Sequence, residues 1–172
     1  PVMRPMVFEF MNDPAVPYLD QQYMLGDALL VAPVFREAKV AQYYLPEGTW
    51  TELLTGETKE GGRWYKGTYD YFSMPLYIRE NSIVVRGNCD TRPDYDYADH
   101  ATVCVYQLKD AAETKVPDVH GNTVFTVKAV KEGDAVKVSV EGAHTELKVE
   151  VFVGNEKKEA VLAADADEVV VA

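Results

Sequence analysis

The stretch Ala135-Val136-Lys137-Val138-Ser139-Val140 alternates strictly between apolar and polar side chains. Successive side chains of a β-strand point to opposite faces, so the three valines share one face while Lys137 and Ser139 share the other. Turn-forming residues lie on both sides, namely Lys131-Glu132-Gly133-Asp134 and Glu141-Gly142-Ala143. The stretch therefore predicts a strand of an antiparallel sheet with one solvated face.

The same pattern continues through the last part of the chain. Alternating or apolar runs occur at residues 102–108, 123–130, 147–153, 160–162 and 169–171, with turns such as His120-Gly121-Asn122 between them. Many short strands separated by turns are typical of a β-sandwich. Residues 98–172 are therefore predicted to form a distal β-sandwich domain.

The middle part, residues 36–97, has the same character. Its predicted strands are residues 41–45, 49–53, 63–65, 71–74, 76–79 and 82–86. Pro46-Glu47-Gly48, Thr55-Gly56-Glu57 and Glu60-Gly61-Gly62 mark turns between them. These residues predict a second, proximal β-sandwich domain, and the fold class is accordingly mainly β.

The first part, residues 1–35, holds two dense apolar runs, at residues 2–10 and 28–35, around a link rich in proline. A continuous apolar run such as residues 28–34 is typical of a strand buried on both faces in a parallel sheet. A buried helix is the alternative, although Pro33 and the short length disfavour it. Two such strands do not form a domain alone.

Composition excludes several classes of protein. The chain has 172 residues, a formal net charge of −11 and 47% hydrophobic residues, which disfavours disorder and nucleic-acid binding. No apolar run approaches the roughly 20 residues that span a bilayer. Two cysteines and the lack of an Asn-x-Ser/Thr sequon favour a cytoplasmic location. No signal peptide is visible. The chain begins with Pro1 rather than with an initiator Met, so we expect a piece of a longer protein.

Acidic residues suggest two kinds of site. The stretch Asp94-Tyr95-Asp96-Tyr97-Ala98-Asp99 resembles the start of a calcium loop. An EF-hand needs an oxygen ligand, Gly and Glu at the positions where this chain has Ala98, Asp99 and Val105, so we expect no metal site.

A second set of acidic residues lies near the ends of predicted strands, where paired carboxylates for glycoside hydrolysis collect. These residues are Glu9, Asp13, Asp20 and Asp27. The simpler interpretation is favoured for them, in which they cap turns and form ion pairs with Arg4 or Arg36.

Aromatic residues gather in the middle part of the chain. Trp50, Trp64 and Tyr71 are candidates for stacking on sugar rings, but Trp and Tyr also build sandwich cores, and the core interpretation is favoured.

Other chemistry has little support. No nucleophile elbow, zinc motif or phosphate-binding loop accompanies the histidines or cysteines, so no cofactor is expected. We expect surface positions for His100, His120 and His144 and a free or packed thiol for Cys89 and Cys104.

Ordered motifs resemble a known family. They are Met3-Arg4-Pro5-Met6-Val7-Phe8-Glu9-Phe10, Asn12-Asp13-Pro14, Asp20-Gln21-Gln22-Tyr23-Met24-Leu25-Gly26-Asp27, Leu29-Leu30-Val31-Ala32-Pro33-Val34, Tyr44-Leu45-Pro46-Glu47-Gly48-Thr49-Trp50, Arg63-Trp64, Pro75-Leu76-Tyr77-Ile78-Arg79-Glu80-Asn81-Ser82 and Arg92-Pro93-Asp94-Tyr95. The chain resembles the C-terminal part of family 31 glycoside hydrolases, and is most similar to the bacterial α-xylosidase branch.

The resemblance implies a retaining α-glycosidase, an α-xylosidase or an α-glucosidase, with a (β/α)₈ barrel followed by two β-sandwich domains. Residues 1–35 would be the last segment of that barrel. The two catalytic aspartates of the family lie upstream, so no catalytic residue is carried over and the chain alone is expected to be inactive and structural. Its parent would act on α-linked oligosaccharides or xylosides, and contacts between copies are a further expectation. Alternatives are a carbohydrate-binding module that uses Trp50, Trp64 and Tyr71, and a non-enzymatic adhesive sandwich.

Overall fold

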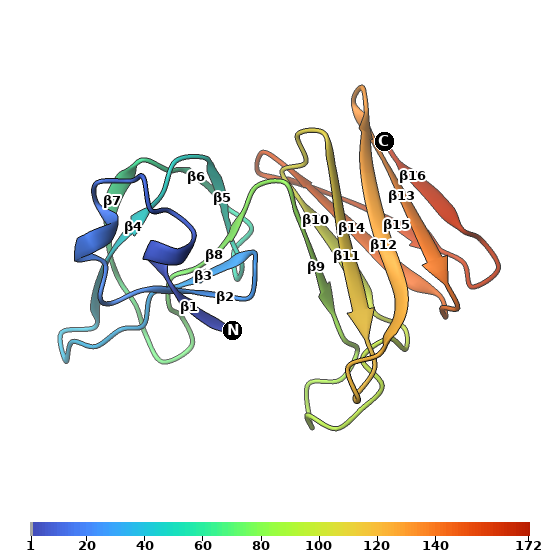
Figure 1. Cartoon of the computed structure of the whole chain (residues 1–172), viewed down its shortest axis with the longest axis horizontal. Helices are drawn as coiled ribbons and strands as arrows, with labels where there is room; N and C mark the ends of the chain where they lie inside the picture. The colour runs from blue at the N-terminus through green and yellow to red at the C-terminus, as the bar shows by residue number, and fades with distance from the viewer. Residues whose placement is uncertain (1) are drawn as a thin grey trace. The chain divides into compact units, whose positions relative to one another are not determined.

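The computed structural model describes residues 2–172, and strands dominate it (Figure 1). The chain forms two compact units, Pro1–Glu80 and Asn81–Ala172. The prediction of a mainly β protein is therefore confirmed. Among residues 2–172, no helix is long and apolar enough to cross a membrane, since the helical segments are 3-10 turns of three residues.

The second unit is a sandwich of two four-stranded sheets. One sheet has the order β15-β14-β10-β9 and consists of β9 (Ser82–Arg86), β10 (Thr102–Tyr106), β14 (Leu147–Val153) and β15 (Glu156–Leu162). The other has the order β11-β12-β13-β16 and consists of β11 (Ala111–Pro117), β12 (Thr123–Glu132), β13 (Ala135–Gly142) and β16 (Glu168–Val171). All neighbours are antiparallel except β10 and β14, which are parallel.

The alternating stretch forms β13, between β12 and β16, and its predicted antiparallel pairing is confirmed. Val136, Val138 and Val140 are buried, whereas Lys137 and Ser139 are partly exposed on the other face. The three valines belong to one apolar core that both sheets share. Burying one face of each sheet against the other is what stabilises this unit.

From residue 2 onward, the first unit contains eight strands and two 3-10 turns. Six strands form an antiparallel sheet of order β1-β2-β3-β8-β5-β6: β1 (Met3–Pro5), β2 (Tyr23–Leu25), β3 (Leu29–Val31), β8 (Leu76–Arg79), β5 (Thr49–Glu52) and β6 (Thr58–Glu60). The remaining pair, β4 (Val40–Leu45) and β7 (Arg63–Thr68), forms an antiparallel ribbon. The turns are η1 (Met6–Phe8) and η2 (Val16–Tyr18).

The sequence pattern suggested that the apolar run at residues 28–34 is a strand of a parallel sheet. The structure shows that this prediction is wrong. Its central part, β3, lies between β2 and β8 and is antiparallel to both. Leu30 and Ala32 are nevertheless buried in the core of the first unit. An apolar run indicates that a segment is buried, whereas the direction of a strand depends on partners distant in the sequence. The run alone therefore could not predict that β3 is antiparallel to its neighbours.

The structure divides the chain after Glu80, whereas the sequence pattern suggested divisions after residues 35 and 97. β9 falls in the second unit because it pairs with β10 in a register that places Ile83 opposite Val105. Residues 3–31 supply three neighbouring strands of the first unit's sheet. Their origin at the end of a barrel in a longer protein stays a prediction.

Aromatic residues fill much of the first unit's core. Tyr43 and Tyr77 are buried, and their hydroxyl oxygens lie 2.8 Å apart. The ammonium group of Lys59 donates to both, at 3.1 Å and 2.7 Å, and Tyr69 donates to Tyr43 at 3.2 Å. Burial raises the pKa of Tyr43, Tyr69 and Tyr77, so all three phenols remain neutral donors and acceptors. This network satisfies the buried hydroxyl groups.

A charged cluster lies on the β9–β10–β14–β15 sheet around Glu150, whose side chain is only 5% exposed. Arg86 and Lys148 approach its carboxylate oxygens at 2.7 Å and 2.9 Å, and Lys157 lies 3.6 Å away. Burial acts to raise the pKa of Glu150, but the hydrogen bond from Lys148 and the charges of Arg86 and Lys157 outweigh it and lower that pKa. Burial raises the pKa of the neighbouring Cys104 thiol to about 11. The ionised carboxylate is therefore part of the folded state.

Replacing Glu150 with Gln tests this cluster. Because the folded-state pKa lies below the ordinary value of 4.5, the stabilisation is present above pH 4.5 and is lost as the pH falls through the folded-state pKa. We expect Glu150→Gln to lose about 1–3 kcal/mol of unfolding free energy at neutral pH, because it removes the charge of a buried, hydrogen-bonded group. The deficit should shrink in acid, as measured by urea unfolding followed by circular dichroism. The control is Glu156→Gln, an exposed carboxylate on β15; an equal effect there would contradict the prediction.

Candidate functional site

The β4–β7 ribbon has two different faces. Tyr43 and Tyr65 lie opposite each other and stack, with ring centroids 5.9 Å apart, and Tyr43 belongs to the core. The next pair along, Tyr44 and Trp64, has centroids 5.5 Å apart and an interplanar angle of 56°. Since side chains alternate along a strand, this second pair shares its face with Gln42. That face carries the candidate site.

Gln22 attaches the loop before β2, residues 18–22, to the edge of β4 that does not pair with β7. Its side-chain amide donates to the carbonyl oxygen of Tyr44 at 2.7 Å and accepts from the Tyr44 N–H at 2.8 Å. Among residues 2–172, β7 is the only strand that pairs with β4, so the amide of Gln22 occupies the place of a missing strand. It satisfies two main-chain groups that a buried residue would otherwise leave unpaired.

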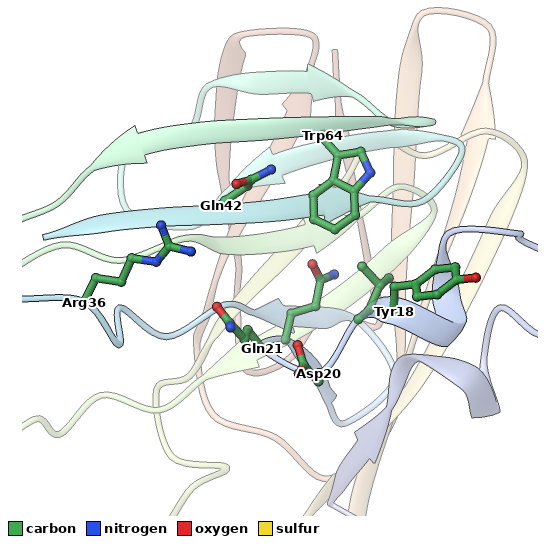
Figure 2. Close-up of a pocket in the computed structure, with 8 residues that line it drawn as sticks. Tyr18, Asp20, Gln21, Arg36, Gln42 and Trp64 are labelled. Carbon is green, nitrogen blue, oxygen red and sulfur yellow. The ribbon is translucent and has the colours of Figure 1, made fainter. Parts of the chain in front are cut away.

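A pocket of about 210 Å³ opens where this loop meets the ribbon. Its lining consists of Tyr18, Leu19, Asp20, Gln21, Gln22, Arg36, Gln42 and Trp64. Figure 2 shows Trp64, Gln42 and Arg36 around a common opening, with Asp20 and Gln21 on the opposite wall. Residues far apart in the sequence are thus brought together at one edge of the ribbon.

The polar side chains of this pocket are available to a ligand. Within residues 2–172, the side chains of Asp20, Gln21, Arg36 and Gln42 form no hydrogen bond or ion pair. Trp64 is 48% exposed although one side packs against Tyr44. Sequence reasoning singled out Trp64 but missed the glutamines and Tyr18, because no local motif connects these positions.

The three aromatic residues proposed from the sequence as a sugar-stacking group do not form one surface. Trp50 is 1% exposed and donates its indole N–H to the carbonyl oxygen of Pro46 at 2.8 Å, so it belongs to the core. Tyr71 is almost fully exposed in a turn, where a strand was predicted for residues 71–74. Only Trp64 of the three lines the pocket.

The four candidate carboxylates have mainly structural contacts. Glu9 lies 2.7 Å from Arg4 and 3.4 Å from Arg79, and Asp27 also pairs with Arg4. Asp13 accepts from the Ala15 N–H and from the hydroxyl of Tyr44. Ion pairing and turn capping, as favoured from the sequence, are confirmed for these three. Asp20 instead lines the pocket beside Trp64.

The histidines differ in their environments. His100 pairs with Asp99, and His120 lies in an exposed turn, whereas His144 is partly buried and contacts the carbonyl oxygens of Thr145 and Ala166. The expectation of a surface position is therefore wrong for His144.

The cysteines and the acidic stretch at residues 94–99 form no further centre. Cys89 and Cys104 are both free, as expected. In the stretch at residues 94–99, Asp96 accepts from the Ala98 N–H and so caps a turn. Residues 2–172 contain no group of three His, Cys, Asp or Glu side chains that is placed to hold a metal ion.

Exposed apolar side chains are unevenly distributed between the units. In the second unit the large exposed ones are all single valines: Val119, Val153, Val161 and Val170. In the first unit they include Phe8, Met11, Tyr18, Phe35, Tyr71 and Phe72, with Tyr71 and Phe72 each 93% exposed. Aromatic and Met side chains are enriched at surfaces that contact a partner, so the first unit is the better candidate for such a contact.

The Tyr71–Phe72 turn is held in place. Asp70 accepts hydrogen bonds from the Phe72 N–H at 2.9 Å and from the Ser73 hydroxyl at 2.7 Å. Lys39 lies 5.4 Å from the centre of the Tyr71 ring. The turn therefore presents both rings outward in an ordered conformation.

Two successive β-domains, the second of them a sandwich, define the class of protein. Residues 1–84 match the glycosyl hydrolase family 31 C-terminal domain, and residues 96–172 match the C-terminal domain of alpha-xylosidase YicI. The chain belongs to glycoside hydrolase family 31 and corresponds to its C-terminal domains.

Individual relatives agree with this assignment. Alpha-xylosidase XylQ of Lactiplantibacillus pentosus is 33% identical over 160 residues, 91% of this chain and 21% of the relative. Alpha-glucosidase 2 of Bacillus thermoamyloliquefaciens is 28% identical over 91% of this chain and 19% of its own length. The chain thus spans about a fifth of the length of these relatives.

Solved structures show the same fold. The GH31 alpha-xylosidase of Xanthomonas citri matches with a TM-score of 0.77 and 28% identity, covering 99% of this chain and 21% of that one. The cycloalternan-forming enzyme of Listeria monocytogenes has a TM-score of 0.83 at 21% identity, over 99% of this chain and 20% of that one, which supports the fold alone.

Removing the amide of Gln22 tests how the pocket is held together. We expect Gln22→Ala to lower the unfolding free energy of the first unit by about 1–3 kcal/mol, because two main-chain groups of Tyr44 lose their partner. Both tryptophans, Trp50 and Trp64, lie in this unit, so tryptophan fluorescence during urea unfolding reports on it. The matched control is Gln21→Ala, for which a change within about 0.5 kcal/mol is expected. Equal effects of the two substitutions would contradict the role given to Gln22.

Proposed function

We propose that this chain is the C-terminal, non-catalytic part of a retaining α-glycosidase and that its role there is structural. The observation that carries the proposal is the succession of two family 31 C-terminal domain matches over residues 1–84 and 96–172. A retaining glycosidase needs two carboxyl groups about 5–5.5 Å apart that are free to react. Glu9, Asp13 and Asp27 are instead engaged by arginines, a tyrosine or main-chain groups.

The exposed apolar residues of the first unit support a role as a docking domain. Phe8, Met11, Tyr71 and Phe72 expose large apolar surface, and burying such surface yields about 25 cal/mol per Å². In the longer protein we assign the contact at these residues to the preceding catalytic domain. The second unit has a closed apolar core and only isolated exposed valines, so it is suited to be the outer domain.

For the longer protein we propose hydrolysis of terminal α-xylosides. The match of residues 96–172 to an alpha-xylosidase domain and the 33% identity to an alpha-xylosidase support this choice over an α-glucosidase, which is the alternative. We further propose a cytoplasmic location, supported by two free thiols and the lack of a glycosylation sequon, and contacts between copies of the protein.

Nitrophenyl glycosides test the proposed division of labour. The 172-residue chain alone is expected to release no nitrophenol from nitrophenyl α-xyloside or α-glucoside. The chain expressed with the preceding part of its coding sequence is expected to release nitrophenol, and faster from the xyloside. Turnover by the isolated chain that is lost in Glu9→Gln or Asp13→Asn would overturn the proposal and place the active site in the first unit.

The docking role predicts a context-dependent effect of the exposed turn. Replacing both Tyr71 and Phe72 with Ser should leave the melting temperature of the isolated chain unchanged within about 1 °C, because both rings are in solvent there. In the longer protein the same change should lower the melting temperature by clearly more than about 1 °C, because two apolar rings lose the contact that buries them. The control is Val161→Ser, an exposed position on β15. Unchanged melting of the longer protein would rule out contact at this turn.

A further inference from the structure

We propose that the pocket beside Trp64 binds an uncharged pyranose ring of an oligosaccharide. The pocket combines a half-exposed indole, a second exposed aromatic ring at Tyr18 and four uncommitted polar side chains (Figure 2). This inference concerns ligand binding by the first unit and does not depend on the structural role proposed above. Of the Trp50, Trp64 and Tyr71 group expected from the sequence, it keeps only Trp64 and adds residues that the fold brings beside it.

The indole of Trp64 supplies the stacking surface. One side of the ring is held by Tyr44 at 5.5 Å between centroids, while 48% of the residue remains in solvent. The apolar face of a pyranose, with its axial C–H groups, packs on such a ring and removes apolar area from water. Tyr44 is itself buried and accepts no ligand, so it acts as a rigid support.

The polar lining matches hydroxyl groups rather than a charged group. Arg36 offers only donors, Asp20 only acceptors, and Gln21 and Gln42 offer both. Because sugar hydroxyls donate and accept, each of these side chains finds a partner on a neutral sugar. The opposite charges of Arg36 and Asp20 offset each other, so the pocket has no net charge to favour a phosphate or a carboxylate.

The pocket wall is preorganised. Gln22 is bonded through both ends of its amide to the main chain of Tyr44 and so fixes residues 18–22 beside the ribbon. A binding surface that is already ordered loses less conformational entropy when the ligand arrives. Because the pocket is small, about 210 Å³, and Trp64 is its main stacking ring, we expect dissociation constants of about 1 mM.

The indole N–H signals in the NMR spectrum give a direct test, because the chain has only two tryptophans. Nitrogen-15-labelled chain is titrated with D-xylose, D-glucose and maltotriose to about ten times the expected dissociation constant. The Trp64 signal is expected to shift in a saturable way. The Trp50 signal is expected to stay in place, since that indole is buried and bonded to Pro46.

Variants separate the pocket from other exposed aromatic residues. Trp64→Ala should weaken binding, read from the main-chain signals of residues 18–22, by about tenfold or more. Gln42→Ala should weaken it about threefold to tenfold, and Tyr71→Ala, an exposed ring outside the pocket, should leave it unchanged. Well-dispersed main-chain signals confirm that each variant is folded.

Several results would overturn the proposal. They are no shift of the Trp64 signal with any of the three sugars, unchanged binding in Trp64→Ala, or equal loss in Tyr71→Ala. Binding of glucose 6-phosphate without binding of the neutral sugars would refute the assigned ligand class and indicate an anion site at Arg36.

Discussion

The pairing of β3 with β8 is the interaction on which the first unit depends. It places Leu29, Leu30 and Val31 opposite Ile78, Tyr77 and Leu76, and main-chain bonds from Ala32 to Pro75 and from Arg79 to Ala28 extend it at both ends. Leu30 and Tyr77 are both buried in the core, so pairing and burial reinforce each other. Without this pairing, β1, β2 and β3 would form a three-stranded flap with an open edge and an exposed apolar face.

A consequence of that pairing is the position of residues 18–22, which precede β2. They lie along the edge of β4, and Gln22 completes the edge as a substitute strand. The β4–β7 ribbon then separates two environments, with Tyr43, Tyr65 and Lys59 on the core side and Trp64 and Gln42 on the other side. The period of two along each strand is what divides aromatic residues of similar chemistry between structural and binding roles.

The two units differ in how completely they bury their own apolar surface. The second unit closes its core between two sheets and exposes only scattered valines. The first unit exposes Phe, Met and Tyr side chains, two of them in a turn that Asp70 holds in shape. A turn ordered to present Tyr71 and Phe72 to water is explained most simply by a surface that covers them, which agrees with the chain's place in family 31.

The sequence by itself determined the β class, the glycine-containing turns on both sides of β13 and the strand at residues 135–140, because alternation and glycine-containing turns are local properties. It also determined the family through ordered motifs. Only the tertiary structure decided the direction of β3, the assignment of β9 to the second unit and the burial of Trp50. It alone brought Tyr18, Arg36, Gln42 and Trp64 to one pocket. Strand partners, burial and shared cavities depend on contacts between residues distant in the chain, and periodicity carries no information about those contacts.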